Sequence, residues 1–177
     1  MFRYLLVGIT IVSFGSLLGC GGAAVKEAPK DIPGWALAQP PLCGVGTSKF
    51  RGNLGMTKTT AETAARADLS RQIETKVKDM VTTYAAEGQT AEGEFSEQKN
   101  VNVTKALSKT TLAGSRPKKA YMSKDNQFYS LVCLEPDVLT KAFEGMKELS
   151  AAARKALAKR AKQAHEDLDK EMEKYDD

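Results

Sequence analysis

The chain has 177 residues, of which 42% are hydrophobic and 27% are charged, and its formal net charge at pH 7 is +4. This length is enough for one domain with its own hydrophobic core. So small a positive charge gives no reason to expect nucleic acid as a partner. The most informative parts of the sequence are the N-terminal end and the cysteines.

Residues 1–19 have the features of an export signal. Arg3 supplies the single charge, an apolar run extends to about Leu18, and Gly19 precedes Cys20. The run is short for a membrane-spanning helix, which needs roughly 20 residues. The sequence therefore predicts a signal peptide at 1–19. The alternative is an uncleaved N-terminal anchor.

The run Leu17-Leu18-Gly19-Cys20 resembles the lipobox of bacterial lipoproteins. The resemblance implies that the chain is cut before Cys20 and that both its sulfur and the new amino terminus are acylated. Several acyl chains hold a protein firmly at a membrane. By the sorting rules of such lipoproteins, Gly21 after the cysteine favours the outer membrane, on its periplasmic or its cell-surface face. Residues 20–33 are small, polar and proline-bearing, which is typical of a lipidated tether.

The two remaining cysteines, Cys43 and Cys133, are expected to form one disulfide bond. Export brings them to a compartment in which disulfides persist. Both lie in strand-like runs, and neighbouring strands bring Cα atoms within about 7 Å. Two buried free thiols are the alternative. A catalytic cysteine is disfavoured, because there is no CxxC motif and the single histidine, His165, lies in a distant charged segment.

The stretch PLCGVGTSKF at 41–50 has two glycines beside hydroxyls and a lysine. Its spacing matches neither G-x-x-x-x-G-K-[ST] nor G-x-G-x-x-G, so it is not a phosphate-binding loop. We interpret it as a strand in which Gly44 and Gly46 share one face, where a helix can approach closely. Cys43 then points to the opposite face, toward Cys133.

A long helix is predicted over residues 60–87, after a Pro/Gly-rich entry segment around Trp35, the first strand at 43–49 and a turn-rich stretch at 51–56. Thr59 with Glu62 fits a capping box, and Gly88 fits a C-terminal stop. Apolar residues recur at helical spacing throughout. They are Ala61, Ala65, Leu69, Ile73, Val77, Val81 and Ala85, widened by Met80 and Tyr84.

The region 89–115 leaves two readings open, since Val101 and Val103 alternate as in a strand while Val103 and Leu107 have helical spacing. A hairpin is predicted next. Its first arm is 120–123, its turn is Asp125-Asn126 and its second arm is 128–134. Both faces of the second arm are largely apolar, which predicts a central strand buried on two sides.

From Pro136 onward apolar residues recur every 3.6 residues, which is the period of an α-helix that does not supercoil. The sequence therefore predicts one long helix, with Gly145 as the position of a kink. Its first part can pack on the sheet, and its later part is expected to project. Residues 154–162 carry a charge of +5 and residues 163–177 a charge of −5. Such a helix could pair antiparallel with a second copy, or remain a single solvated helix. The apolar positions are Leu139, Phe143, Met146, Leu149, Ala153, Leu157, Ala161, Ala164, Leu168, Met172 and Tyr175.

Together, Pro33-Gly34-Trp35, GVGTSK, AETAARADLSRQIETKV and FYSLVCLEP resemble the Lpp-twenty family of bacterial lipoproteins, which includes the flagellar outer-membrane lipoprotein FlgP. The resemblance covers about 33–137. It implies an α+β domain at 34–137, with a three- to four-stranded antiparallel sheet packed on a long helix like an opened dodecin. The charged C-terminal helix predicted at 138–177 is a departure from the family pattern. Known family roles are structural, in the envelope and around flagellar motors, and the family brings no catalytic, cofactor-binding or metal-binding residues.

These features favour a non-enzymatic lipoprotein with a structural or assembly role in the envelope. Its expected partners are the membrane, through the lipid on Cys20, and either further copies of itself or an envelope complex. An enzyme is disfavoured because H-E-x-x-H and G-x-S-x-G motifs are absent, and no cofactor is expected. The alternative is a periplasmic carrier of a small ligand or lipid on the same anchor.

Overall fold

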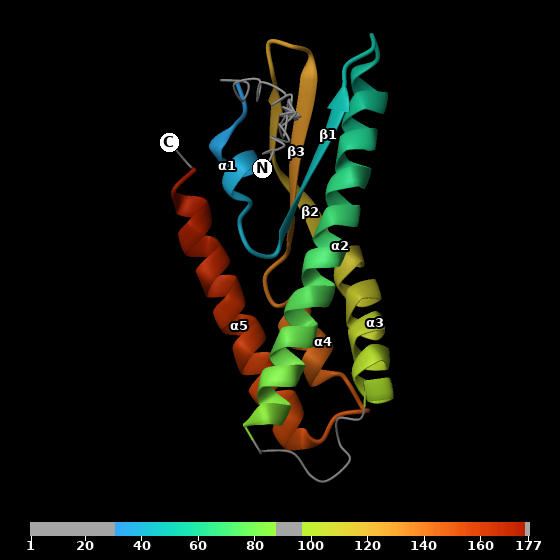
Figure 1. The fold of residues 1–177 in the computed structure, drawn as a ribbon, viewed down its shortest axis with the longest axis vertical. Helices are drawn as coiled ribbons and strands as arrows, with labels where there is room; N and C mark the ends of the chain where they lie inside the picture. Colours follow the sequence, from blue (N-terminus) through green and yellow to red (C-terminus); the bar gives the residue numbers. More distant parts are fainter. Residues whose placement is uncertain (1–30, 88–96, 176–177) are drawn as a thin grey trace, which may run out of the picture. The chain divides into compact units, whose positions relative to one another are not determined.

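The computed structural model of the chain describes residues 31–87 and 97–175. The signal peptide predicted at 1–19, the lipidation site Cys20 and the tether up to Lys30 therefore lie outside the described residues. Helices and strands are mixed (Figure 1), which confirms the predicted α+β class. The elements are α1 (Gly34–Ala38), β1 (Cys43–Lys49), α2 (Leu54–Ala86), α3 (Glu97–Ala113), β2 (Ser115–Met122), β3 (Gln127–Leu134), α4 (Val138–Glu144) and α5 (Ala151–Glu173).

The sheet has three strands in the order β1-β3-β2, and both pairings are antiparallel. The predicted hairpin is therefore confirmed, and its second arm is the central strand. Most of β3 is buried, as its apolar faces predict. The first arm is longer than predicted and includes Pro117, next to an irregularity in the register. An edge strand tolerates this proline because its outer side needs no ladder hydrogen bond.

The long helix α2 begins at Leu54, six residues before the predicted start. Asn53 is its N-cap, and the Oδ1 atom of Asn53 accepts a hydrogen bond from the Met56 backbone N–H at 3.0 Å. The predicted capping box at Thr59 is therefore wrong. Glu62 instead lies 3.6 Å from the Arg66 guanidinium, one helical turn later. With 33 residues, α2 is about 50 Å long.

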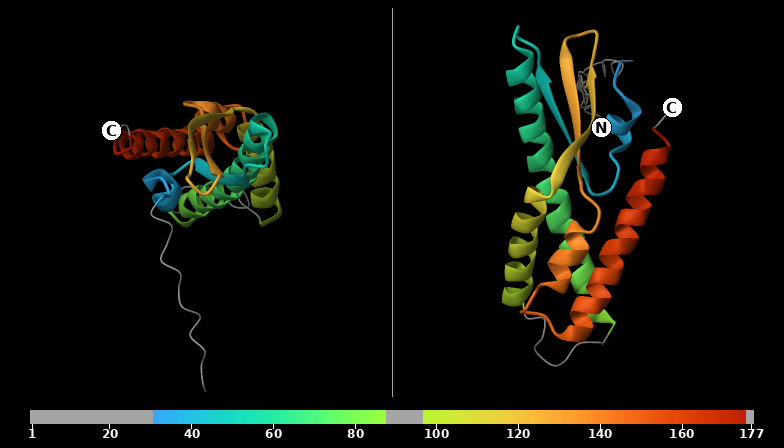
Figure 2. Two further views of the ribbon diagram at one scale, coloured as in Figure 1. Left: turned by 90° about the horizontal axis from the view of Figure 1, so that it is seen from above. Right: turned by 180° about the vertical axis from the view of Figure 1, so that it is seen from behind.

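The two halves of α2 pack against different partners. Its first half lies along β1 and β3, while its second half lies beside α3 and α5 (Figures 1 and 2). One buried stripe serves both halves, as the sequence predicts. It consists of Thr57, Ala61, Ala65, Leu69, Ile73, Val77, Met80, Val81 and Tyr84.

Residues Glu97–Ala113 form helix α3, which decides between the strand and helix readings of this region. Val103 and Leu107 are both buried, and their spacing of one helical turn places them on the same face. That face packs against α2 and α4. The alternation of Val101 and Val103 is therefore incidental, and Val101 is exposed.

The predicted single C-terminal helix is wrong, because the chain forms two helices with a reversal between them. α4 ends at Glu144 with Gly145 as its C-cap, and α5 begins after Ser150, whose Oγ accepts a hydrogen bond from the Ala153 N–H at 3.2 Å. α5 then runs back past α4 and does not project (Figure 2). The physical reason is its apolar stripe, because Leu157 and Leu168 are buried in the core.

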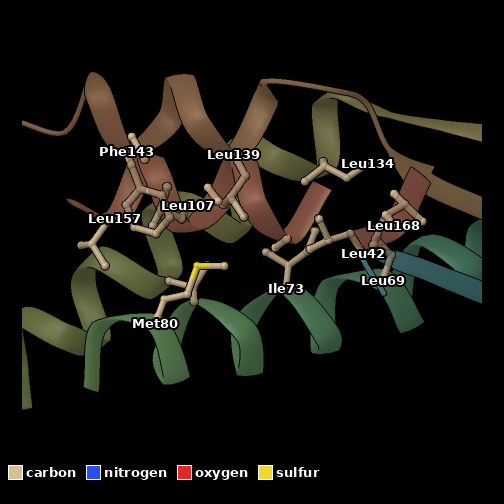
Figure 3. Close-up of a cluster of buried hydrophobic side chains, with 14 of the residues drawn as sticks. Leu42, Leu69, Ile73, Met80, Leu107, Leu134, Leu139, Phe143, Leu157 and Leu168 are labelled. Atoms are coloured by element: carbon tan, nitrogen blue, oxygen red, sulfur yellow. The ribbon is translucent and has the colours of Figure 1, made fainter. Parts of the chain in front are cut away.

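Figure 3 shows the core where α2 meets the later helices. Side chains from α2 face those of α3, α4 and α5 across a continuous apolar layer. The main contacts of α4 are with α3 and α5, so the prediction that this segment packs on the sheet is replaced by packing among helices. The labelled residues are Leu42, Leu69, Ile73, Met80, Leu107, Leu134, Leu139, Phe143, Leu157 and Leu168.

Candidate functional site

The two cysteines predicted to pair lie directly opposite each other on β1 and β3. The Cα atoms of Cys43 and Cys133 are 4.0 Å apart and their sulfurs 2.09 Å apart, which fits a disulfide bond. Both side chains are buried. The Leu134 N–H donates to the Leu42 carbonyl at 2.9 Å, so the cysteines occupy the neighbouring non-hydrogen-bonded position, where strands are closest.

The opposite face of β1 lies against the backbone of α2, as the two glycines predict. A Cβ on Gly44 would lie 2.0 Å from the Ala65 carbonyl oxygen and 2.4 Å from the Leu69 nitrogen. Gly46 has the same relation to the next turn of α2 toward its N-terminus. Strand β1 is thus held on both faces, by the cysteine pair on one side and by helix contact on the other.

Asp68 of α2 accepts hydrogen bonds at the free edge of β1. Its carboxylate accepts from the Val45 N–H at 3.1 Å, from the Gln39 amide and from Arg71 and Gln72 of its own helix. The Val45 N–H points away from β3, so without Asp68 it would be an unpaired edge donor. Sequence reasoning missed this residue, and no local motif marks it, because the donor lies 23 positions earlier in the chain.

Asp31, in the last part of the predicted tether, binds the hairpin between β2 and β3. Its carboxylate accepts hydrogen bonds from the Lys124 backbone N–H and from the Tyr121 hydroxyl. The Lys124 bond and then the Tyr121 bond hold the pKa of Asp31 below its ordinary value of 3.8. The same contact raises the pKa of Tyr121 above its ordinary value of 10.0, because loss of the phenolic proton would remove the hydrogen bond that the hydroxyl donates to Asp31.

Arg160 of α5 joins the C-terminal helix to the end of α2. Its Nη2 atom lies 2.6 Å from both carboxylate oxygens of Glu87, and its Nη1 donates to the Met80 carbonyl at 3.3 Å. The guanidinium carbon also lies 5.9 Å from the centroid of the Tyr84 ring. The sequence placed Arg160 in a basic segment but gave no sign that it points inward.

The described cavities are grooves between elements. One of about 260 Å³ reaches Cys133 between the sheet and α5, with Leu168 and Met172 on its helix side. That volume is below the roughly 300–1,000 Å³ of most ligand sites. A larger groove of about 600 Å³ runs along α4 and α5 beside Lys155, Lys159 and Lys162. His165, which the sequence placed far from the cysteines, lines the smaller groove together with Cys133. Because the Cys133 sulfur is bonded to Cys43, it offers no free thiol to the histidine.

Within the described ranges, no group of three or more His, Cys, Asp or Glu side chains is placed to hold a metal ion. Of the helices in residues 31–87 and 97–175, none has the length and apolar character needed to cross a membrane. In comparisons with known proteins, no family model and no curated sequence matches the chain. Functional inference therefore rests on the residues and contacts described above.

Proposed function

We propose that the protein is a non-enzymatic lipoprotein, anchored in the outer membrane through lipid on Cys20, with a structural or assembly role in the cell envelope. The observation that carries the proposal is the Cys43–Cys133 pair, opposed across β1 and β3 at disulfide distance. Disulfides form and persist in oxidising compartments. The export signal expected at 1–19 would deliver the chain to such a compartment, and the lipobox-like LLGC would fix it there.

The arrangement of the domain supports a structural role. Three charged side chains make polar contacts that join elements of their own domain, namely those of Asp68, Arg160 and Asp31. Side chains used in this way stabilise a fixed shape and are not free to act on a substrate. A rigid domain of this kind suits a component of an assembly.

The packing of the sheet on α2 supports the expected likeness to the Lpp-twenty family. A fold like an opened dodecin and an association with the flagellum are further parts of this proposal. The helices α4 and α5 lie beyond the stretch of about 33–137 that carries the resemblance, and they give this chain a surface of its own.

The anchor is tested by metabolic labelling with an alkyne analogue of palmitate in cells that express the full chain. The wild type should incorporate label and appear in the membrane fraction. Cys20→Ser should lose the label. The matched control is the double variant Cys43→Ala/Cys133→Ala, which should retain the label because neither cysteine is the acylation site. Label that persists in Cys20→Ser would contradict the anchor.

Membrane sorting has a separate test. Gly21→Asp should move the protein from the outer to the inner membrane in a density gradient, because aspartate at this position retains lipoproteins at the inner membrane, while Gly21→Ser should leave it in place. An equal distribution of the two variants would contradict outer-membrane sorting.

The assembly role is tested by cross-linking in intact cells, followed by purification of the full chain. Recovery of further copies or of other envelope proteins supports the proposal. A monomer without any cross-linked partner, carrying a stoichiometric lipid in native mass spectrometry, would instead favour the alternative of a carrier.

A further inference from the structure

The outward face of α5 carries three lysines followed by three carboxylates in a single line, which we call the charged stripe. The spacings between successive members are four, three, four, three and four residues, so all six share one helical face. All six are exposed, and the core residues Leu157 and Leu168 lie on the opposite face. The stripe consists of Lys155, Lys159, Lys162, Glu166, Asp169 and Glu173.

The other basic residues of this segment are engaged within the domain. Arg160 binds Glu87 and the Met80 carbonyl, and the Arg154 guanidinium reaches the Met146 carbonyl. Among the described residues, the side chains of the three stripe lysines have no hydrogen bond or ion pair. On the acidic half, Asp169 lies 3.8 Å from the His165 ring, and Lys174 pairs with Glu171 beside the stripe. Lys170 is a further flanking cation. The stripe therefore keeps most of its charge for contacts outside the domain.

The stripe is complementary to itself when reversed. Lys155 and Glu173 lie nine residues on either side of position 164, Lys159 and Asp169 lie five residues on either side, and Lys162 and Glu166 lie two residues on either side. Two α5 helices that run antiparallel about this position place every lysine opposite a carboxylate. A parallel pair would place like charges together. We propose that α5 is the docking surface for a second copy of this chain, in that antiparallel register.

The surface beside the lysines has room for a second helix. The groove of about 600 Å³ is lined by Thr140 and Glu144 of α4 and by the small side chains of Ala152, Ala156 and Ala158, together with the three lysines. Small residues let helix axes approach more closely. A symmetric pair uses the same patch twice, as in most homodimers. The stripe would then supply six lysine–carboxylate contacts, three from each copy.

The proposed pair keeps the antiparallel arrangement considered from sequence and adds to it a helix face and a register. The apolar stripe of α5 is buried in its own domain, so only the opposite face is open to a partner. The inference does not depend on lipid at Cys20, because it uses α5 and α4 alone. Exposed ion pairs are individually weak, so the pair relies on all six contacts and weakens with added salt.

The decisive experiment is a charge swap in the full chain, purified in detergent and studied by sedimentation equilibrium. The acidic variant is Lys155→Glu/Lys159→Glu/Lys162→Glu, and the basic variant is Glu166→Lys/Asp169→Lys/Glu173→Lys. We expect each variant alone to raise the dimer dissociation constant by about tenfold or more. An equimolar mixture of the two should form heterodimers at least as well as the wild type.

The matched control moves three charges elsewhere. Lys76→Glu/Lys105→Glu/Lys147→Glu changes the net charge by the same amount on exposed sites of α2, α3 and the turn before α5, and it should dimerise like the wild type. The proposal is overturned if this control weakens association as much as the acidic variant, or if the mixture fails to associate while both swapped variants remain folded by circular dichroism.

The register is tested by zero-length carbodiimide coupling, which joins a lysine amine to a carboxylate in contact with it. Lys155 and Glu173 are 18 positions apart on one helix, or about 27 Å, so a link between them can form only between copies. We expect this link in tandem mass spectrometry of the wild type, between isotopically labelled and unlabelled chains. A wild type that stays monomeric, or dimers linked through other residues, would overturn the proposal. The proposal would also be overturned if the acidic variant dimerised like the wild type and differed from it only in weaker binding to anionic vesicles.

Discussion

The backbone of Gly46 in β1 lies directly against the carbonyl of Ala61 in α2, since a Cβ on Gly46 would be 2.0 Å from that oxygen. Gly44 stands in the same relation to Ala65, also at 2.0 Å. Such an approach is too close for any side chain. Two positions on one face of β1 therefore set the distance between the sheet and α2, and larger residues there would force the two layers apart.

Replacing Gly46 by alanine should destabilise the domain. The added methyl group would overlap backbone atoms of α2, and overpacking of this kind costs about 1–3 kcal/mol or more. Chemical denaturation should show a lower midpoint with an unchanged slope. Gly55→Ala is the matched control. Its Cβ would meet only the Asn53 side chain at 3.4 Å, and it should leave the midpoint unchanged or raise it, because alanine favours helix. Equal effects of the two substitutions would refute the close-approach argument.

Removing the cysteine pair should lower stability more than any surface change. The bond would close a loop between positions 90 residues apart, and the chain-entropy relation gives about 4–5 kcal/mol for such a loop. Cys43→Ala/Cys133→Ala and reduction of the wild type should lower the unfolding midpoint to a similar extent. Thiol labelling of the unreduced, unfolded wild type should find neither cysteine free. Two labelled thiols would contradict the disulfide.

Arg160 should couple energetically to Glu87. A double-mutant cycle with Arg160→Met and Glu87→Gln should give a coupling of about 1 kcal/mol, since the ion pair is close but partly exposed. Arg160→Lys should keep part of the coupling, because one nitrogen contacts both Glu87 oxygens, but lysine cannot also donate to the Met80 carbonyl as the second guanidinium nitrogen does. Lys159→Met changes a neighbouring outward-facing charge and should not alter unfolding of the monomer. A coupling free energy of zero would show that this contact adds no stability.

The Asp31 contact should contribute stability that depends on pH. Its pKa is lowered in the folded state by the hydrogen bonds from Lys124 and Tyr121, so the contribution is present above the ordinary value of 3.8 and is lost as the pH falls through the folded value. The raised pKa of Tyr121 makes stability depend on pH in the alkaline range. Its contribution is present below 10.0 and is lost as the pH rises through the folded value.

Unfolding midpoints measured across the pH range should fall at acid pH, where the Asp31 contribution is lost, and at alkaline pH, where the Tyr121 contribution is lost. These two parts of the profile are its acid limb and its alkaline limb. Asp31→Asn should flatten the acid limb relative to the wild type and also remove the alkaline one, while Tyr121→Phe should remove the alkaline limb and weaken the acid one. Asp125→Asn, on the same hairpin turn, is the control and should leave both limbs in place. Identical profiles for Asp31→Asn and the wild type would argue against the contact.

The parts of the fold that were predictable from sequence are those that depend on local pattern and simple pairing. The alternating glycines predicted the close face of β1, and the apolar faces of residues 128–134 predicted the central strand. The cysteine pair followed from two strand-like runs and a single possible partner for each cysteine. In each case the residue types themselves restrict the neighbours they can accept.

The parts that were missed depend on partners distant in sequence or on competing local signals. Both Asn53 and Thr59 can cap a helix, and which one does so depends on where β1 ends. Asp68 has no motif, because its donor belongs to another element. The continuous 3.6-residue period hid the reversal after Gly145, since both α4 and α5 present their apolar residues to the same core.

The N-terminal end of the described domain lies beside the end of α5, where a Cβ on Gly34 would be 3.4 Å from the Tyr175 ring. In the proposed antiparallel pair, the two points at which the chains enter their domains would therefore lie at opposite ends of the dimer. If both copies are lipid-anchored in one leaflet, an orientation with the shared helix axis along the bilayer brings both entry points equally close to the lipid. Dimerisation would then decide whether the protein stands upright from the membrane or lies flat upon it.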